Sequence, residues 1–134
     1  EFYTTYKHNQ KTIKMEVLTQ NAKKVDTQLL MLTHLSQLTT YVTGFGGFVI
    51  PLIIWLTKKD EIADMDEHGK SIINFQITML LSALLSIPLI LAFGLGILTL
   101  IFIGVLSFVL PIINAVRASK GESPSLFCTI EFIK

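Results

Sequence analysis

Hydrophobic residues along the chain fall into two long blocks, which a short charged segment separates. The first block covers residues 29–57 and the second runs from Ile72 to Val116, and neither contains an Asp, Glu, Lys or Arg. As one helix, the second block would be about 67 Å long at ~1.5 Å per residue, more than twice the ~30 Å hydrocarbon core of a bilayer. The second block therefore predicts two membrane helices joined by a turn.

Glycines indicate where each block turns. In the second block, Gly94 and Gly96 lie near the middle and divide it into helices at about 71–93 and 97–117. The first block has a cluster of breakers near its middle, which consists of Gly44, Gly46, Gly47 and Pro51. This cluster leaves two alternatives open: one tilted helix that crosses the bilayer once, or two short helices at 29–43 and 48–58 that form a hairpin.

The expected fold is therefore all-α: a polytopic membrane helical bundle with four hydrophobic helical segments, the first two of them short. Residues 29–117 form the membrane domain, between a polar, basic segment at 1–28 and a polar tail at 118–134. The first segment is either a helix on the membrane surface or a solvated tail, and it lacks the apolar run of a signal peptide. Residues 126–133 alternate loosely, as in a short strand or an interfacial segment.

Composition supports a membrane protein. Of the 134 residues, 51% are hydrophobic and 16% are charged, against roughly 25% charged residues in a soluble domain. A net charge of +1 gives no global field for binding nucleic acid. The single cysteine, Cys128, excludes an internal disulfide, and no Cys/His spacing suggests a zinc site.

The distribution of basic residues predicts the topology. All 11 Lys and Arg residues lie in 1–28, in the connector 58–70 or close to the C-terminus. Cytoplasmic flanks of membrane helices are rich in these residues. A hairpin at 29–57 would keep all of them on one side, so we expect an N-in/C-in protein of a bacterial inner membrane.

Two groups of residues in and beside the first block could carry chemistry. His34 lies in an apolar segment, where it either has a titratable role or bonds to a neighbouring helix; packing is the favoured alternative. The connector contains Asp66, Glu67 and His68, which could bind a divalent cation. Its three lysines favour a solvated loop instead, with Asp66 or Glu67 at the start of the next helix.

Polar residues recur every three or four positions along both later helices. In the third segment they form a stripe that includes Asn74, and the fourth segment carries Asn114 with small residues at similar steps. Such a stripe either packs the bundle internally or lines a wetted path; packing is favoured because these segments carry no charge. No nucleophile, base and acid come together in the pattern, so we expect no catalytic residues, no cofactor and no metal.

Several runs of residues resemble a family of short bacterial membrane proteins, the Tic-twenty-like family, which is related to a chloroplast import component. The runs are LTHLS at 32–36, PLIIWLTKKD at 51–60, DEHGKSIINFQ at 66–76 and ASKGE at 118–122. The resemblance implies a four-helix membrane fold and an association with protein translocation. It also draws attention to a set of matching residues as candidates for partner contact or structure: Asp66, Glu67, His68, Lys70, Asn74 and Gln76.

The function expected from the sequence is that of a non-enzymatic membrane subunit or accessory factor in protein translocation or membrane assembly. Its partners would be the lipid bilayer and either other membrane subunits or further copies of itself. A stand-alone protective protein, such as a bacteriocin immunity or envelope-stress factor, is the alternative. A small pore or transporter is disfavoured because no charged residue lies within the membrane segments.

Overall fold

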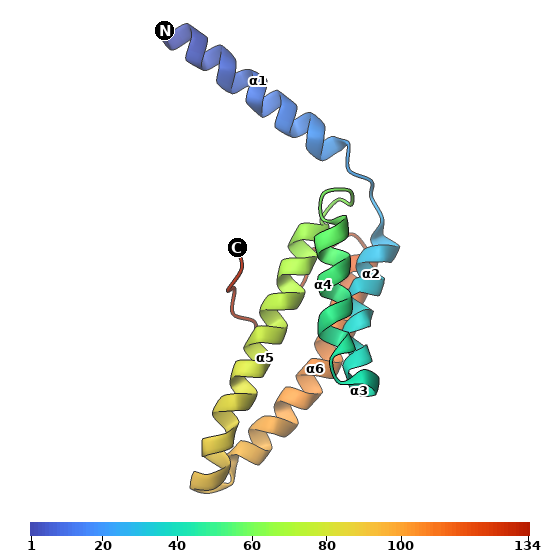
Figure 1. Cartoon of the computed structure of the whole chain (residues 1–134), viewed down its shortest axis with the longest axis vertical. Coiled ribbons are helices and arrows are strands. Elements are labelled where there is room, and N and C mark those ends of the chain that lie inside the picture. Colours follow the sequence, from blue (N-terminus) through green and yellow to red (C-terminus); the bar gives the residue numbers. More distant parts are fainter.

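The chain is described by a computed structural model, which covers the backbone of all 134 residues and every side chain except those of Thr19, Gln20, Asn21 and Phe93. Within this described structure, the regular elements are all helical. They are α1 (Phe2–Asn21), α2 (Thr27–Leu35), the 3-10 turn η1 (Ser36–Thr39), α3 (Thr40–Thr43), α4 (Gly46–Lys58), α5 (Met65–Phe93) and α6 (Leu95–Ser119) (Figure 1). The expectation of an all-α protein is therefore confirmed.

The two longest helices, α5 and α6, form an antiparallel hairpin that runs the full length of the folded body (Figure 1). They meet at Gly94, whose φ of 68° is left-handed and favours glycine. Two residues later, Gly96 packs directly against the backbone of Ser86, where a Cβ atom would not fit. Glycine at these two positions allows a one-residue turn between two long helices.

The shorter helices form a second hairpin beside the first. The chain descends through α2, η1 and α3, turns at Gly44 with a φ of 80°, and returns through α4 to the end where it began (Figure 1). At the turn, Gly47 lies against the backbone of Gln37, too close for a side chain. The first hydrophobic block is therefore arranged as the hairpin alternative.

Within the part of the chain that the structure describes, two helices, and not four, are long and apolar enough to cross a membrane, which corrects the expectation of four membrane segments. The candidate spans are Met65–Ala92 and Leu95–Ser119. By contrast, α4 has 13 residues and α2 has nine, so at ~1.5 Å per residue each reaches about 20 Å or less of the ~30 Å hydrocarbon core. The glycine cluster that closes this hairpin also limits the length of its helices.

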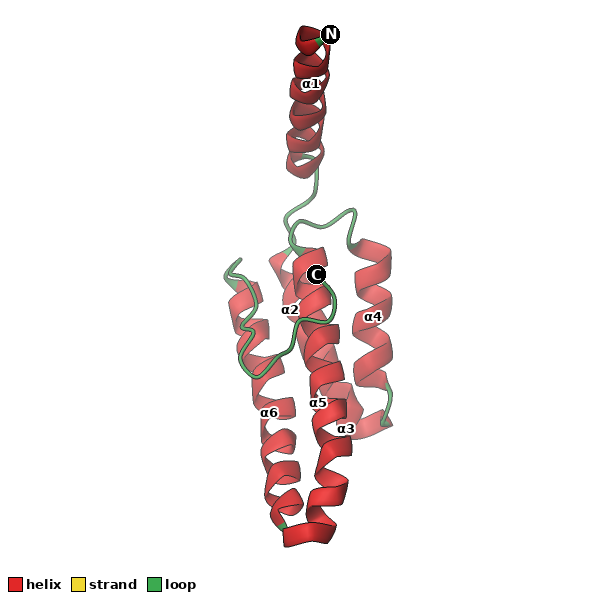
Figure 2. Ribbon diagram, turned by 90° about the vertical axis from the view of Figure 1, so that its left-hand side faces the viewer, coloured by secondary structure: helices red, strands yellow, loops and turns green.

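Both ends of the chain lie outside the four-helix body. Helix α1 projects away from it, and the C-terminal tail folds back along α5 and α6 as an irregular segment (Figure 2). Residues 126–133 form no strand; an isolated bridge pairs Lys24 with Ile62 instead. This bridge ties the segment before α2 to the connector between α4 and α5.

Two clusters of buried side chains form the core. The larger cluster joins α2, α4, the connector, α5 and α6 through Leu30, Trp55, Ile62, Met65, Ile73 and Ala118. The smaller cluster lies between α5 and α6 and consists of Phe75, Met79, Leu106 and Leu110. We call the part of the body that holds the connector, the starts of α2 and α5 and the end of α6 the charged end, and residues 80–105 the distal hairpin.

Candidate functional site

Two histidines from different helices meet inside the charged end. His34 on α2 and His68 near the start of α5 are 0% and 1% exposed, and His34 Nε2 lies 2.8 Å from His68 Nδ1. Their rings meet edge to face, with centroids 5.1 Å apart. A neutral imidazole has one donor and one acceptor nitrogen, so the two rings can form a hydrogen bond only if one donates to the other.

The neighbours of the two rings assign the direction of this hydrogen bond. The amide nitrogen of Gln37 lies 3.5 Å from His34 Nδ1, and because an amide N–H can only donate, Nδ1 is the acceptor. His34 therefore carries its proton on Nε2 and donates to His68, which in turn bonds to the backbone of Glu122. Burial, and secondly the charge that His68 can carry, lowers the pKa of His34 far below its ordinary value.

Gln76 extends this network to the second hairpin. Its amide nitrogen donates to the carbonyl oxygen of Gly47 and lies 3.5 Å from the side-chain oxygen of Gln37. The network therefore links α2, η1, α4 and α5 through side chains that lie far apart in the sequence. Its chemistry is that of a structural lock, because the two imidazoles are buried and already bonded to each other.

A second set of contacts fixes the junction between α4 and α5. The indole nitrogen of Trp55 donates to Asp66, 2.9 Å away, and Lys70 pairs with the same carboxylate at 2.6 Å. Gly69 lies directly beneath the Trp55 ring, where a Cβ atom would collide with it. Sequence reasoning missed Trp55; the signal was available, since a buried indole N–H usually finds an acceptor.

The polar stripes of α5 and α6 hold the C-terminal tail. Asn74 accepts hydrogen bonds from the backbone N–H groups of Phe132 and Ile133 and donates to the Ile133 carbonyl. Asn114 does the same for Ser125, and the Thr78 hydroxyl accepts from the N–H of Ile130. These side chains bond to backbone groups, so they hold the path of the tail whatever side chains it carries.

The candidates from the sequence thus occupy three places. His34, His68 and Gln76 belong to the buried network, Asp66 and Lys70 to the Trp55 junction, and Asn74 and Asn114 to the contacts with the tail; Glu67 is exposed. Among the side chains that the structure describes, no three His, Cys, Asp or Glu residues gather where they could hold a metal ion. The carboxylates of the connector are spread over the surface instead.

Comparison with known proteins identifies a family. Residues 25–133 match the family model described as the magnetosome magnetite crystal formation protein family. No curated protein and no solved structure was found to match the chain. The match covers most of the chain, including every helix from α2 to α6, so the chain belongs to this family.

This finding corrects the expected relationship to the Tic-twenty-like family, and the association with protein translocation that came with it is not supported. The reason lies in what the resembling residues do. In DEHGK, Asp66 bonds to Trp55, His68 to His34, and Gly69 makes room for the Trp55 ring. These residues stabilise the junction between helices, so their presence does not indicate that the protein acts on a translocated substrate.

Proposed function

We propose that this chain is a non-enzymatic, multi-pass protein of the magnetosome membrane that supports magnetite crystal formation as a subunit of a membrane protein assembly. The observation that carries this proposal is the family match over residues 25–133. That range contains both candidate spans, the α2–α4 hairpin and the buried polar network. Helix α1 lies outside the range and is not needed for the proposed role.

The arrangement of charges supports one orientation in the membrane. The connector, the start of α2 and the end of α6 lie at the same end of the body, and the α5–α6 turn lies at the other (Figure 1). Since cytoplasmic flanks favour Lys and Arg, the proposed orientation places the charged end and both termini on the cytoplasmic side of the magnetosome membrane. The Gly94 turn then reaches the opposite side.

The native cysteine provides a test of this orientation. Cys128 is exposed and is the only cysteine in the sequence. A membrane-impermeant maleimide should label it on isolated magnetosomes, whose cytoplasmic face is outward, without any detergent. Labelling that requires detergent would contradict the orientation, and a Cys128→Ser variant measures the background.

The distal hairpin is the proposed contact with other membrane subunits. Close helix packing in membranes depends on small residues that let backbones approach. Gly104 on α6 is exposed, and no atom lies within 4 Å of the position that a Cβ atom would occupy. A partner helix can therefore approach α6 where a Cβ atom of Gly104 would lie, and a bulky side chain there would keep the partner away; the Gly104 carbonyl oxygen itself accepts a hydrogen bond from the Tyr41 hydroxyl.

The decisive experiment combines purification with crystal measurement in magnetosome-forming cells. We expect the chain, extracted from magnetosome membranes in mild detergent, to retain other membrane proteins in a fixed ratio, and its deletion to change magnetite crystal size in electron micrographs. Gly104→Leu should lose the retained proteins and fail to restore crystal size, whereas the neighbouring Val105→Leu should behave as wild type. Purification of the chain alone, together with unchanged crystals in the deletion strain, would contradict the proposal.

A further inference from the structure

A cavity of about 340 Å³ lies between the first two turns of α5 and the C-terminal tail. Glu67, Lys70 and Ser71 line it from α5, and Leu126, Glu131 and Lys134 line it from the tail. Figure 2 shows how the tail crosses this part of α5. The hydrogen bonds between Asn74 and the tail backbone, one donated and two accepted by Asn74, keep the two walls of the cavity in place.

Ser71 is the polar group in this cavity that lacks a partner. Its residue is 4% exposed, and within the described part of the chain its hydroxyl oxygen forms no hydrogen bond. A buried hydroxyl without a partner costs roughly 1–3 kcal/mol, and native structures contain few of them. Ser71 is one of the residues that line the cavity, although its hydroxyl oxygen is itself buried, so a ligand seated against Ser71 would satisfy the hydroxyl once the side chain turns toward the cavity.

The charges around the cavity match a ligand that carries both signs. Two lysines and two glutamates line it: Lys70, Lys134, Glu67 and Glu131. Lys70 is already paired with Asp66, but the three ion pairs among the described side chains do not include Lys134 or Glu131. Lysines favour a phosphate and glutamates favour an ammonium group, so a ligand with only one charged group would leave half of the lining unmatched.

The cavity also lies at the boundary between the polar and apolar parts of α5. Ser71 directly precedes the charge-free stretch that begins at Ile72. The tail beside the cavity exposes Phe127, Ile130 and Phe132. Exposed aromatic and apolar side chains next to charged ones are typical of segments that lie at the level of lipid headgroups.

We infer that this cavity binds the headgroup of a phospholipid that carries a primary ammonium, of the phosphatidylethanolamine type. The phosphate lies against Lys134, Lys70 and the Ser71 hydroxyl, and the ammonium lies against Glu131 and Glu67. The acyl chains extend from the cavity toward the exposed apolar face of α5, which begins at Leu80. This inference needs only the folded chain in a bilayer, so it stands apart from the proposed role in crystal formation.

The test measures the thermal unfolding midpoint of the full-length chain in detergent during separate lipid titrations. The probes are dioleoyl-phosphatidylethanolamine, the phosphatidylcholine and phosphatidylglycerol with the same chains, and soluble phosphoethanolamine. We expect phosphatidylethanolamine to half-saturate its stabilising effect at a concentration at least tenfold lower than the other three. Phosphatidylcholine should bind more weakly because its quaternary ammonium cannot donate hydrogen bonds to the glutamates. Phosphatidylglycerol should bind more weakly because its headgroup has no cation to pair with them.

Variants distinguish a bound headgroup from general solvation. Ser71→Ala should weaken the phosphatidylethanolamine effect about tenfold while leaving lipid-free stability unchanged or higher, because it removes an unpartnered hydroxyl. Lys134→Gln and Glu131→Gln, both at exposed positions, should each weaken it several-fold, and Ser107→Ala on α6, away from the cavity, should not. Equal effects of all lipids, or equal behaviour of Ser71→Ala and Ser107→Ala, would overturn the inference. Soluble phosphoethanolamine that binds as tightly as the lipid would overturn the assignment to a membrane lipid.

Discussion

The charged end and the distal hairpin are built from the same two helices, yet they use their side chains in opposite ways. On α5, residues 71–75, 78 and 79 are buried, whereas large apolar residues are exposed from Leu80 onward. The change occurs where the α2–α4 hairpin no longer covers α5 (Figure 1). At the charged end, α5 is therefore covered by other parts of the protein, whereas in the distal hairpin its apolar side chains are exposed on the surface of the molecule.

Polar side chains show the same contrast. Between the charged end and the α3–α4 turn they join segments that are distant in sequence: His34 to His68, Gln76 to Gly47 and Asn74 to the tail. In the distal hairpin, the hydroxyls of Ser86 and Thr99 bond to carbonyl oxygens of their own helices, four residues earlier. Similar residue types therefore fix the tertiary fold at one end, while the Ser86 and Thr99 hydroxyls at the other end are satisfied within their own helices.

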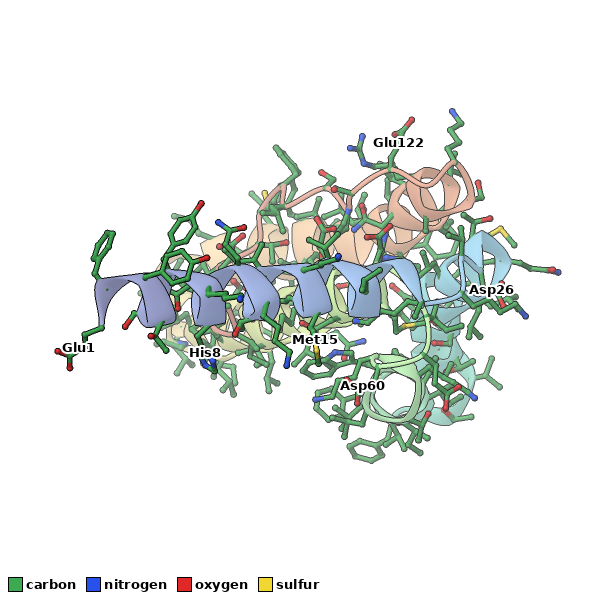
Figure 3. The ribbon with its side chains drawn as sticks, turned by 90° about the horizontal axis from the view of Figure 1, so that it is seen from above. Glu1, His8, Met15, Asp26, Asp60 and Glu122 are labelled. Atoms are coloured by element: carbon green, nitrogen blue, oxygen red, sulfur yellow. The ribbon has the colours of Figure 1, made fainter. Side chains whose placement is uncertain are left out.

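In the view from above, along the long axis of the body, α1 projects toward the viewer in front of the body and carries side chains on all of its sides (Figure 3). His8 and Met15 are exposed on α1. This makes α1 a convenient reference for both regions, because a substitution at one of its exposed positions alters neither the polar network nor the apolar hairpin.

The largest effect is expected from breaking the charged end at its centre. His34→Ala leaves a cavity and removes the donor to His68, so we expect a loss of about 3–5 kcal/mol in the free energy of unfolding. Thermal or denaturant unfolding in detergent measures this loss, with His8→Ala on α1 as the matched control that should stay within about 0.5 kcal/mol. A loss below ~1 kcal/mol for His34→Ala would show that the network does not hold the charged end together.

A slightly smaller effect is expected from placing a charge on the distal hairpin. Leu85 is 69% exposed on α5, so in water Leu85→Arg would be almost neutral, but at the centre of a bilayer an arginine costs about 2.5–3.5 kcal/mol. We expect a marked drop in the membrane-inserted fraction, measured by carbonate extraction. Leu18→Arg on α1, at a residue that is 58% exposed, is the control. Equal insertion of the two variants would mean that the distal hairpin does not lie in lipid.

The contrast between the two regions also explains how much of the fold the sequence predicts. The charge-free stretch from Ile72 to Val116 predicts the α5–α6 pair, because a bilayer imposes a simple rule on composition and length. Gly94 lies at the turn for an equally local reason, its left-handed φ. The number of spans was wrong, because helix length inside the first block depends on where the chain turns, and two alternatives were open there.

The candidate site was harder to predict because its contacts are not local. His34 and His68 are 34 residues apart, and Asn74 bonds to a residue 59 positions away. Sequence periodicity does not predict such pairs. A polar stripe on one helix indicates that this face is buried, but it does not identify the residues that the face contacts. For Trp55 the sequence signals only that a buried indole needs an acceptor; it does not identify Asp66, which is 11 residues away on the next helix.

The stability of the charged end should depend on pH because His34 is buried there. His34 lies on α2, outside both candidate spans, and its pKa in the folded chain is lowered from 6.5 by burial and by His68. The unfolded chain therefore binds a proton below about pH 6.5 that the folded chain excludes, so stability is full above that pH and is lost as the pH falls, by up to about 1.4 kcal/mol per pH unit.

Unfolding midpoints measured between pH 7.5 and 5 test this dependence. His34→Gln can keep a hydrogen bond to His68 and has no proton to gain at this position, so its profile should be flatter than that of the wild type. A substitution that removes no titratable group, Leu18→Gln at an exposed position of α1, should leave the profile unchanged. A wild-type midpoint that does not change down to pH 5 would contradict the buried, neutral state of His34.

The smallest effect is expected at the outer edge of the charged end. Asp66→Asn keeps an oxygen that can accept the hydrogen bond from Trp55 but loses the ion pair with Lys70. The side chains of Asp66 and Lys70 are 42% and 31% exposed, respectively. Partly exposed pairs of this kind contribute about 0.2–1 kcal/mol and weaken as salt screens them. We therefore expect Asp66→Asn to lower the free energy of unfolding by about 0.5 kcal/mol at low salt and by less in 0.5 M NaCl. A loss above ~2 kcal/mol that does not depend on salt would place Lys70 and Asp66 in a low-dielectric environment, and the boundary between water and membrane would then lie on the connector side of the first turn of α5.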